Sequence, residues 1–240
     1  MRSFFVSMPP DKLPSSKVLL FLHGVGEAFD PLEGGGRGRG VRNLFRHGVP
    51  NILSEPAGLG SSPSPPPVFD RFVTIAPQMF LREDMASPAE IDRMIDQACR
   101  IARAVLDGAA PAIAVMGFSR GGYAAFRLAR RPEVKVIVSM DAATPVPPTP
   151  QEFAAAIAAT PVPFWAFYAE YPDDPGYQNA ITSAHRLIDV PEVPLATVPQ
   201  QAQCKTVLPI ASSGSDKHVE VARQVSASSF VYEWMLRQLG

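Results

Sequence analysis

Cysteine is scarce in this chain, and neither sign of charge dominates it. Among 240 residues there are only two cysteines, Cys99 and Cys204, which are too few for a disulfide scaffold or a cysteine-rich zinc module. The 22 basic and 23 acidic side chains leave a net charge of -1, so the chain lacks the basic excess typical of proteins that bind nucleic acid or anionic membranes. No metal or cofactor is implied, and a small molecule is the expected partner.

Long hydrophobic runs are also missing. The longest clean apolar run covers residues 18–22, whereas a membrane-spanning helix needs about 20 apolar residues. The first ten residues contain one arginine, a short apolar stretch and no small-residue cleavage site, so they do not match a secretory signal. We therefore expect no membrane span and a cytoplasmic location; nothing in the sequence selects an oligomeric state.

Short apolar segments alternate with segments of helical spacing, a pattern typical of a mostly parallel sheet with helices on both faces. The expected strands lack in–out alternation, as in strands buried on both faces, and cover residues 17–22, 71–76, 112–116, 134–140, 162–168 and 205–210. Pro209 cannot donate to a sheet ladder, so the last strand is expected at a sheet edge. The expected helices cover residues 87–108, 121–130, 151–158, 177–188 and 228–239, with a short one near 41–47.

The length fits a single α/β domain over residues 1–240, with a long loop insertion at about 27–69. The insertion contains a glycine-arginine run at 34–40 and a proline-serine stretch at 56–67. Only about 20 residues separate the strands at 134–140 and 162–168, which leaves no obvious place for a large lid.

Residues 117–121 read Gly-Phe-Ser-Arg-Gly and match the pattern G-x-S-x-G. The motif follows an apolar strand and precedes a predicted helix, which is the context of a nucleophile on a sharp strand-to-helix turn. Gly117 and Gly121 would let the neighbouring chains approach closely, and Ser119 would project at the carboxyl edge of the sheet. We therefore predict Ser119 as a nucleophile.

A serine hydroxyl needs a base to take its proton, and the chain has four histidines. His218 comes after the last predicted strand and before the C-terminal helical region, which is the position expected of the base. His47 lies in the insertion and His185 in a predicted helix, so neither fits as well.

The third member of a triad should be an acid on a loop at the same sheet edge. Asp173 and Asp174 follow the strand at 162–168 and give the order Ser, Asp, His; the sequence does not choose between them. Asp141, directly after the preceding strand, is an alternative, and Glu170 is a further one.

Negative charge that develops on a substrate oxygen requires N–H donors placed in advance. The backbone amide of Arg120 is one candidate, and the amide of Val25, in the turn after the first apolar strand, is the other. His23 and Gly24 end that strand; we interpret His23 as a residue that supports the turn by hydrogen bonding rather than as an acid or base.

Together these residues resemble the α/β-hydrolase superfamily, and more narrowly small serine esterases related to the phospholipase/carboxylesterase and dienelactone hydrolase groups. The resemblance rests on Leu-His-Gly-Val-Gly-Glu at 22–27, Ile-Ala-Pro-Gln at 75–78, Met-Gly-Phe-Ser-Arg-Gly-Gly-Tyr at 116–123, and the closing segment 231–238. It implies a hydrolase-fold sheet with Ser119 as nucleophile, His218 as base and a carboxylate from Asp173 or Asp174.

The leading hypothesis is a cofactor-independent serine hydrolase that cleaves a carboxylic ester or thioester of small to medium acyl group through an acyl-enzyme. A peptidase or lactone hydrolase with the same triad is an alternative within the enzyme class. A non-catalytic ligand-binding protein on the hydrolase fold is the alternative from another class.

Overall fold

The computed structural model describes residues 4–9, 17–24, 44, 48–54, 67–78, 88–106, 111–143, 150–169, 205–210 and 216–240. Its centre is a seven-stranded sheet with the order β1-β3-β2-β4-β5-β6-β7. Strand β1 pairs antiparallel with β3, and all other pairs are parallel. The strands are β1 (Phe4–Ser7), β2 (Lys17–Leu22), β3 (Phe72–Pro77), β4 (Ile113–Phe118), β5 (Val134–Met140), β6 (Phe164–Ala169) and β7 (Lys205–Ile210).

The six strands predicted from the sequence are all present, and β7 lies at a sheet edge as its proline required. Strand β4 continues through Gly117 to Phe118, two residues further than predicted, because the turn begins only at Ser119. Strand β1 was not predicted: its four residues form the opposite edge of the sheet and carry no periodic signal.

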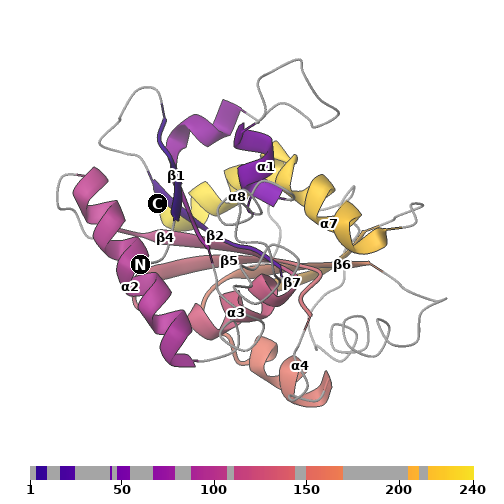
Figure 1. The fold of residues 1–240 in the computed structure, drawn as a ribbon. Helices are drawn as coiled ribbons and strands as arrows, with labels where there is room; N and C mark the ends of the chain where they lie inside the picture. The colour runs from indigo at the N-terminus through magenta and orange to yellow at the C-terminus, as the bar shows by residue number, and fades with distance from the viewer. Residues whose placement is uncertain are drawn as a thin grey trace, which may run out of the picture.

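Helices cover both faces of the sheet, as predicted (Figure 1). One face carries α1 (Gly48–Ser54), α7 (Lys217–Ser226) and α8 (Ser229–Leu239), and the other carries α2 (Pro88–Val105), α3 (Arg120–Leu128) and α4 (Pro150–Ala158). Helices α1 and α7 and the 3-10 turn η3 (Pro67–Arg71) were not predicted. The helix expected at 177–188 lies outside the described residues, as does all of 41–47 except Leu44.

Apolar packing fixes the helices on the sheet. Helix α2 turns Ile91, Met94 and Ile95 inward, at the three- and four-residue spacing of one helix face. On the opposite face, Trp234 of α8 stacks on Trp165 of β6 with ring centroids 4.1 Å apart and planes 11° from parallel. No helix in the described part of the chain is both long enough and apolar enough to cross a bilayer. Because strands β2 to β6 are parallel and held by this packing, their carboxyl ends lie at the same edge of the sheet.

Candidate active site

Ser119 occupies a strained turn between β4 and α3. Its backbone angles are φ 56° and ψ -121°, a region that non-glycine residues rarely adopt. Its N–H donates to the carbonyl of Met140 at 2.9 Å, and its carbonyl accepts from the amides of Gly122 at 3.0 Å and Ala143 at 3.0 Å. Because both polar groups of this peptide are bonded to the end of β5 and to the first turn of α3, the strained conformation is held from two sides.

Glycines make this turn possible. A Cβ at Gly117 would lie 2.2 Å from the carbonyl oxygen of Gly121, and a Cβ at Gly121 would lie 2.1 Å from the carbonyl oxygen of Leu22 in β2. Both neighbours are backbone atoms, so neither can move without shifting a strand or a helix. The two glycines that sequence reasoning assigned to support of the turn are therefore required by close backbone packing.

His218 and Asp141 meet at the same edge of the sheet. The Nδ1 atom of His218 donates to Oδ2 of Asp141 at 2.6 Å. Asp141 is fully buried, and its second carboxylate oxygen accepts from the amide of Ala169 at 3.0 Å. Its own amide donates to the carbonyl of Phe167 at 2.7 Å, and its φ is 48°. Both carboxylate oxygens therefore have N–H partners, as a buried carboxylate requires.

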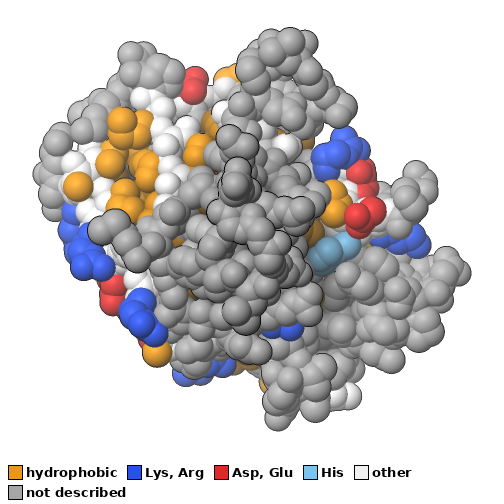
Figure 2. Space-filling model, in the orientation of Figure 1, with side chains coloured by type: hydrophobic (Ala, Val, Ile, Leu, Met, Phe, Trp, Pro, Cys, Tyr) orange, Lys and Arg blue, Asp and Glu red, His pale blue; other side chains and the backbone are white. Residues whose placement is uncertain are grey.

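This contact selects the tautomer of the imidazole. A carboxylate oxygen only accepts hydrogen bonds, so Nδ1 of His218 carries the proton that it shares with Asp141. In the neutral ring Nε2 then holds a lone pair, which is the form a general base needs. The His218 side chain remains 16% exposed, so solvent or substrate can reach it. Figure 2 shows a histidine side chain at the surface beside acidic and basic residues.

The carboxylate beside His218 is thus the alternative that the sequence left open. Asp173 and Asp174, the pair preferred from the sequence, lie outside the described residues, as do Glu170, His47 and His185. The strand order explains why Asp141 takes this place: β5 is the immediate neighbour of β4, so the residue after β5 ends beside the residue after β4. The sequence offered only the position of Asp141 directly after a predicted strand.

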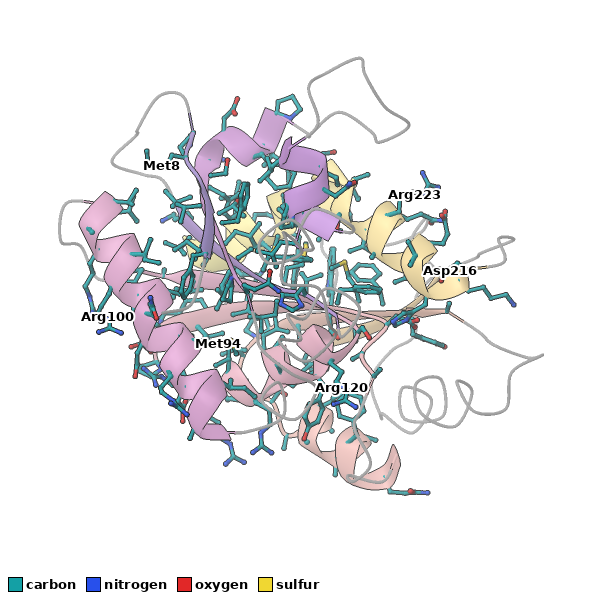
Figure 3. All side chains as sticks on the ribbon, in the orientation of Figure 1. Met8, Met94, Arg100, Arg120, Asp216 and Arg223 are labelled. Atoms are coloured by element: carbon teal, nitrogen blue, oxygen red, sulfur yellow. The ribbon has the colours of Figure 1, made fainter. Side chains whose placement is uncertain are left out.

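His218 lies in the first turn of α7, whereas the sequence placed it on a loop before the C-terminal helical region. Asp216 caps this helix, since its Oδ1 accepts from the amide of Val219 at 3.1 Å. The capping hydrogen bond spans His218 and fixes its backbone. Figure 3 shows Asp216 at the start of α7 and Arg120 at the start of α3.

Of the remaining predicted site residues, His23 and Gly24 directly follow β2. His23 is buried, and its Nδ1 donates to the carbonyl of Gly24 at 2.6 Å. Burial lowers the pKa of His23 to about 4, so the ring is neutral near pH 7 and unsuited to supply a proton. Arg120 is the first residue of α3, and Val25 lies outside the described residues.

Comparison with known proteins gives the fold a name. No family model matches the chain, and no curated protein matches it. Among solved structures, a Klebsiella pneumoniae protein provisionally named a dienelactone hydrolase matches with a TM-score of 0.58 at 12% identity, covering 99% of this chain and 92% of that one. Est1E from Butyrivibrio proteoclasticus, with ferulic acid bound, matches with a TM-score of 0.56 at 11% identity, over 99% and 95% of the two chains.

The chain has the α/β-hydrolase fold. An esterase from Pyrococcus furiosus adds a third match, with a TM-score of 0.57 at 9% identity over 100% of this chain and 93% of that one. At such identities the likeness concerns the fold, and on that level it confirms the resemblance inferred from the sequence. Within this α/β-hydrolase fold, Ser119, His218 and Asp141 follow strands β4, β7 and β5.

The glycine packing yields a graded prediction. Gly121→Ala should cost about 3 kcal/mol or more of unfolding free energy, because its Cβ would meet the backbone of β2. Gly122→Ala should cost less, about 1–2 kcal/mol, because its Cβ would meet the Ser139 hydroxyl at 2.8 Å and Cβ and Cα of Ala142 at 3.0 and 3.1 Å, which would have to shift by only a few tenths of an ångström. Urea unfolding of both variants measures the difference; equal losses would contradict the packing argument.

His23 should make stability depend on pH. The unfolded imidazole takes up a proton near pH 6.5 and the folded one only near 4, so the unfolded state binds more protons between these values. The free energy of unfolding that depends on a neutral His23 is fully present above pH 6.5. It decreases as the pH falls, by about 2 kcal/mol at pH 4.5. Urea unfolding at pH 7.5 and 4.5 should show a steeper loss for the wild type than for His23→Asn. Parallel losses in the two proteins would disprove this role of burial.

Proposed function

We propose that this protein is a serine hydrolase that cleaves a carboxylic ester or thioester of small to medium acyl group. The observation that carries the proposal is the contact between His218 and the buried Asp141, with Nδ1 and Oδ2 2.6 Å apart, at the sheet edge where Ser119 follows β4. A hydroxyl on a strained turn, a correctly protonated imidazole and a buried carboxylate are the parts that acyl transfer requires.

In the first half-reaction Ser119 Oγ attacks the carbonyl carbon of the substrate while its proton passes to Nε2 of His218. The carbonyl π pair moves to oxygen and forms an oxyanion. When that pair returns, the bond to the alkoxide or thiolate breaks, and the leaving group takes the proton from Nε2. An acyl-enzyme on Ser119 and a free alcohol or thiol result.

The oxyanion would be stabilised by backbone amides. The amide of Arg120 is at the start of α3, where the helix dipole also favours negative charge. The amide of Val25 would be the second donor, from the turn that follows Gly24. Support comes from the close approach of Gly121 to the backbone of Leu22 and His23, which brings the end of β2 close to the Ser119 turn.

In the second half-reaction a water molecule gives its proton to Nε2 of His218 and attacks the acyl carbon. Collapse of this intermediate returns the proton to Ser119 Oγ and releases the carboxylic acid. Throughout, Asp141 keeps the proton of His218 on Nδ1 and stabilises the imidazolium that forms in each half-reaction. The Ala169 amide, bonded to the other carboxylate oxygen, keeps Asp141 in this orientation.

Covalent labelling tests these roles. Intact mass should show one fluorophosphonate adduct on the wild type, none on Ser119→Ala and greatly slowed labelling of His218→Ala. Asp141→Asn should lower kcat for p-nitrophenyl butyrate by about 10²- to 10⁴-fold, because the amide can hold the wrong tautomer. Asp173→Asn and Asp174→Asn serve as matched controls and should retain most of the wild-type kcat.

If Asp173→Asn or Asp174→Asn lowered kcat and Asp141→Asn did not, the triad acid would be one of the two aspartates that follow β6 in the sequence. If folded wild-type protein showed neither adduct nor turnover, the hydrolase proposal would fall and a ligand-binding role would replace it. Unchanged melting temperatures are required for each comparison.

The short connection between β5 and β6 favours small acyl groups. Its helix α4 packs onto α3 through Phe153, whose ring centroid lies 5.3 Å from that of Tyr123, so this helix belongs to the core rather than to a lid. In a p-nitrophenyl ester series, kcat/KM should be highest for acetate to hexanoate. A steady rise through decanoate and longer chains would contradict the prediction.

A further inference from the structure

His218 is held from two directions. Asp141 bonds its Nδ1 at 2.6 Å, and the ring of Phe118 lies along the imidazole with centroids 4.5 Å apart and planes 37° from parallel. A hydrogen bond at Nδ1 fixes one corner of the ring but leaves its plane free to turn about that bond. Such a turn displaces Nε2, the atom that must accept the Ser119 proton.

The position of Phe118 opposes that rotation of the imidazole plane. Phe118 is the last residue of β4 and is only 3% exposed, so its ring is enclosed by the core and cannot follow the imidazole. A centroid separation of 4.5 Å is at the short end of the range of about 4.5–7 Å for aromatic pairs. The buried Phe118 ring therefore restricts movement of the imidazole toward that side.

Phe118 and Ser119 are neighbours in the sequence, joined by one peptide bond. Ser119 follows Phe118 directly, and the amide of Ser119 is bonded to the carbonyl of Met140, the residue before Asp141. The position of the Phe118 ring is thus tied to both the hydroxyl and the carboxylate between which the imidazole must work.

We propose that Phe118 is a positioning residue that holds the imidazole of His218 in the plane in which Nε2 faces Ser119. The inference rests on the proposed serine-hydrolase function and adds a residue to it. A residue that served only the core would affect stability without a selective effect on the chemical step, so the two roles can be separated.

The test uses the full chain and p-nitrophenyl butyrate. Phe118→Leu should lower kcat about tenfold with KM changed by less than about twofold, since the general base is misplaced while the substrate pocket persists. Phe118→Tyr keeps a ring and should restore most of the lost kcat. The rate of fluorophosphonate labelling should fall in Phe118→Leu in proportion to kcat. If Phe118→Leu does not fold, Phe118→Met removes the flat ring at nearly constant volume.

Phe126→Leu is the matched control. Phe126 is a buried ring of α3 that packs on Phe153 and Phe164, so its loss should lower the melting temperature while kcat stays near the wild-type value. Wild-type kcat in Phe118→Leu, or a loss that Phe118→Tyr does not relieve, would overturn the positioning role while the hydrolase proposal stands. Absence of adduct and turnover in the wild type would overturn both.

Discussion

The positive φ of Ser119 is the constraint on which the rest of the site depends. A non-glycine residue in such a conformation costs about 1–3 kcal/mol and persists only where its surroundings fix it. Here the end of β5 and the first turn of α3 supply the backbone hydrogen bonds that do so. That arrangement forces helix and strand so close together that Gly117 and Gly121 have no room for a Cβ. Because Gly121 also lies against the backbone of Leu22 and His23, the Ser119 turn is packed directly on the end of β2.

The end of β5 and the residues after it link Ser119 to Asp141. Met140 accepts a hydrogen bond from Ser119, Asp141 provides the carboxylate, and Ala143 donates back to Ser119. A displacement of this segment would therefore move the serine and the carboxylate together. The full burial of Asp141 makes the two hydrogen bonds from His218 and Ala169 to its carboxylate necessary, since an unpaired carboxylate inside a protein costs several kcal/mol. The same contacts that satisfy the charge also set the orientation of the imidazole.

Local patterns predicted the parts of the structure that depend on local physics. The buried strands, the amphipathic helix α2 and the serine turn all have signals within a few residues of sequence, and the structure contains them. The contact between His218 and Asp141 joins residues 77 positions apart and depends on strand order, which periodicity does not reveal. Asp141 was therefore only an alternative to the later aspartates. Helix α7 was missed because Val219, Val221 and Val225 are β-branched and weaken the helical signal, while the Asp216 cap and tertiary packing support the helix.

Because His218 lies on a helix rather than on a loop, different contacts hold it. The first turn of α7 is fixed by the Asp216 cap, and Val221 and Val225 anchor the same helix in the core. The backbone of His218 is thus set by helix packing, one ring nitrogen by β5 through Asp141, and one side of the ring by β4 through Phe118. Since β4 and β5 are adjacent and hydrogen-bonded over their whole length, these restraints cannot drift independently. The orientation of His218 is therefore set without a contribution from the edge strand β1, which lies at the opposite end of the sheet from β7.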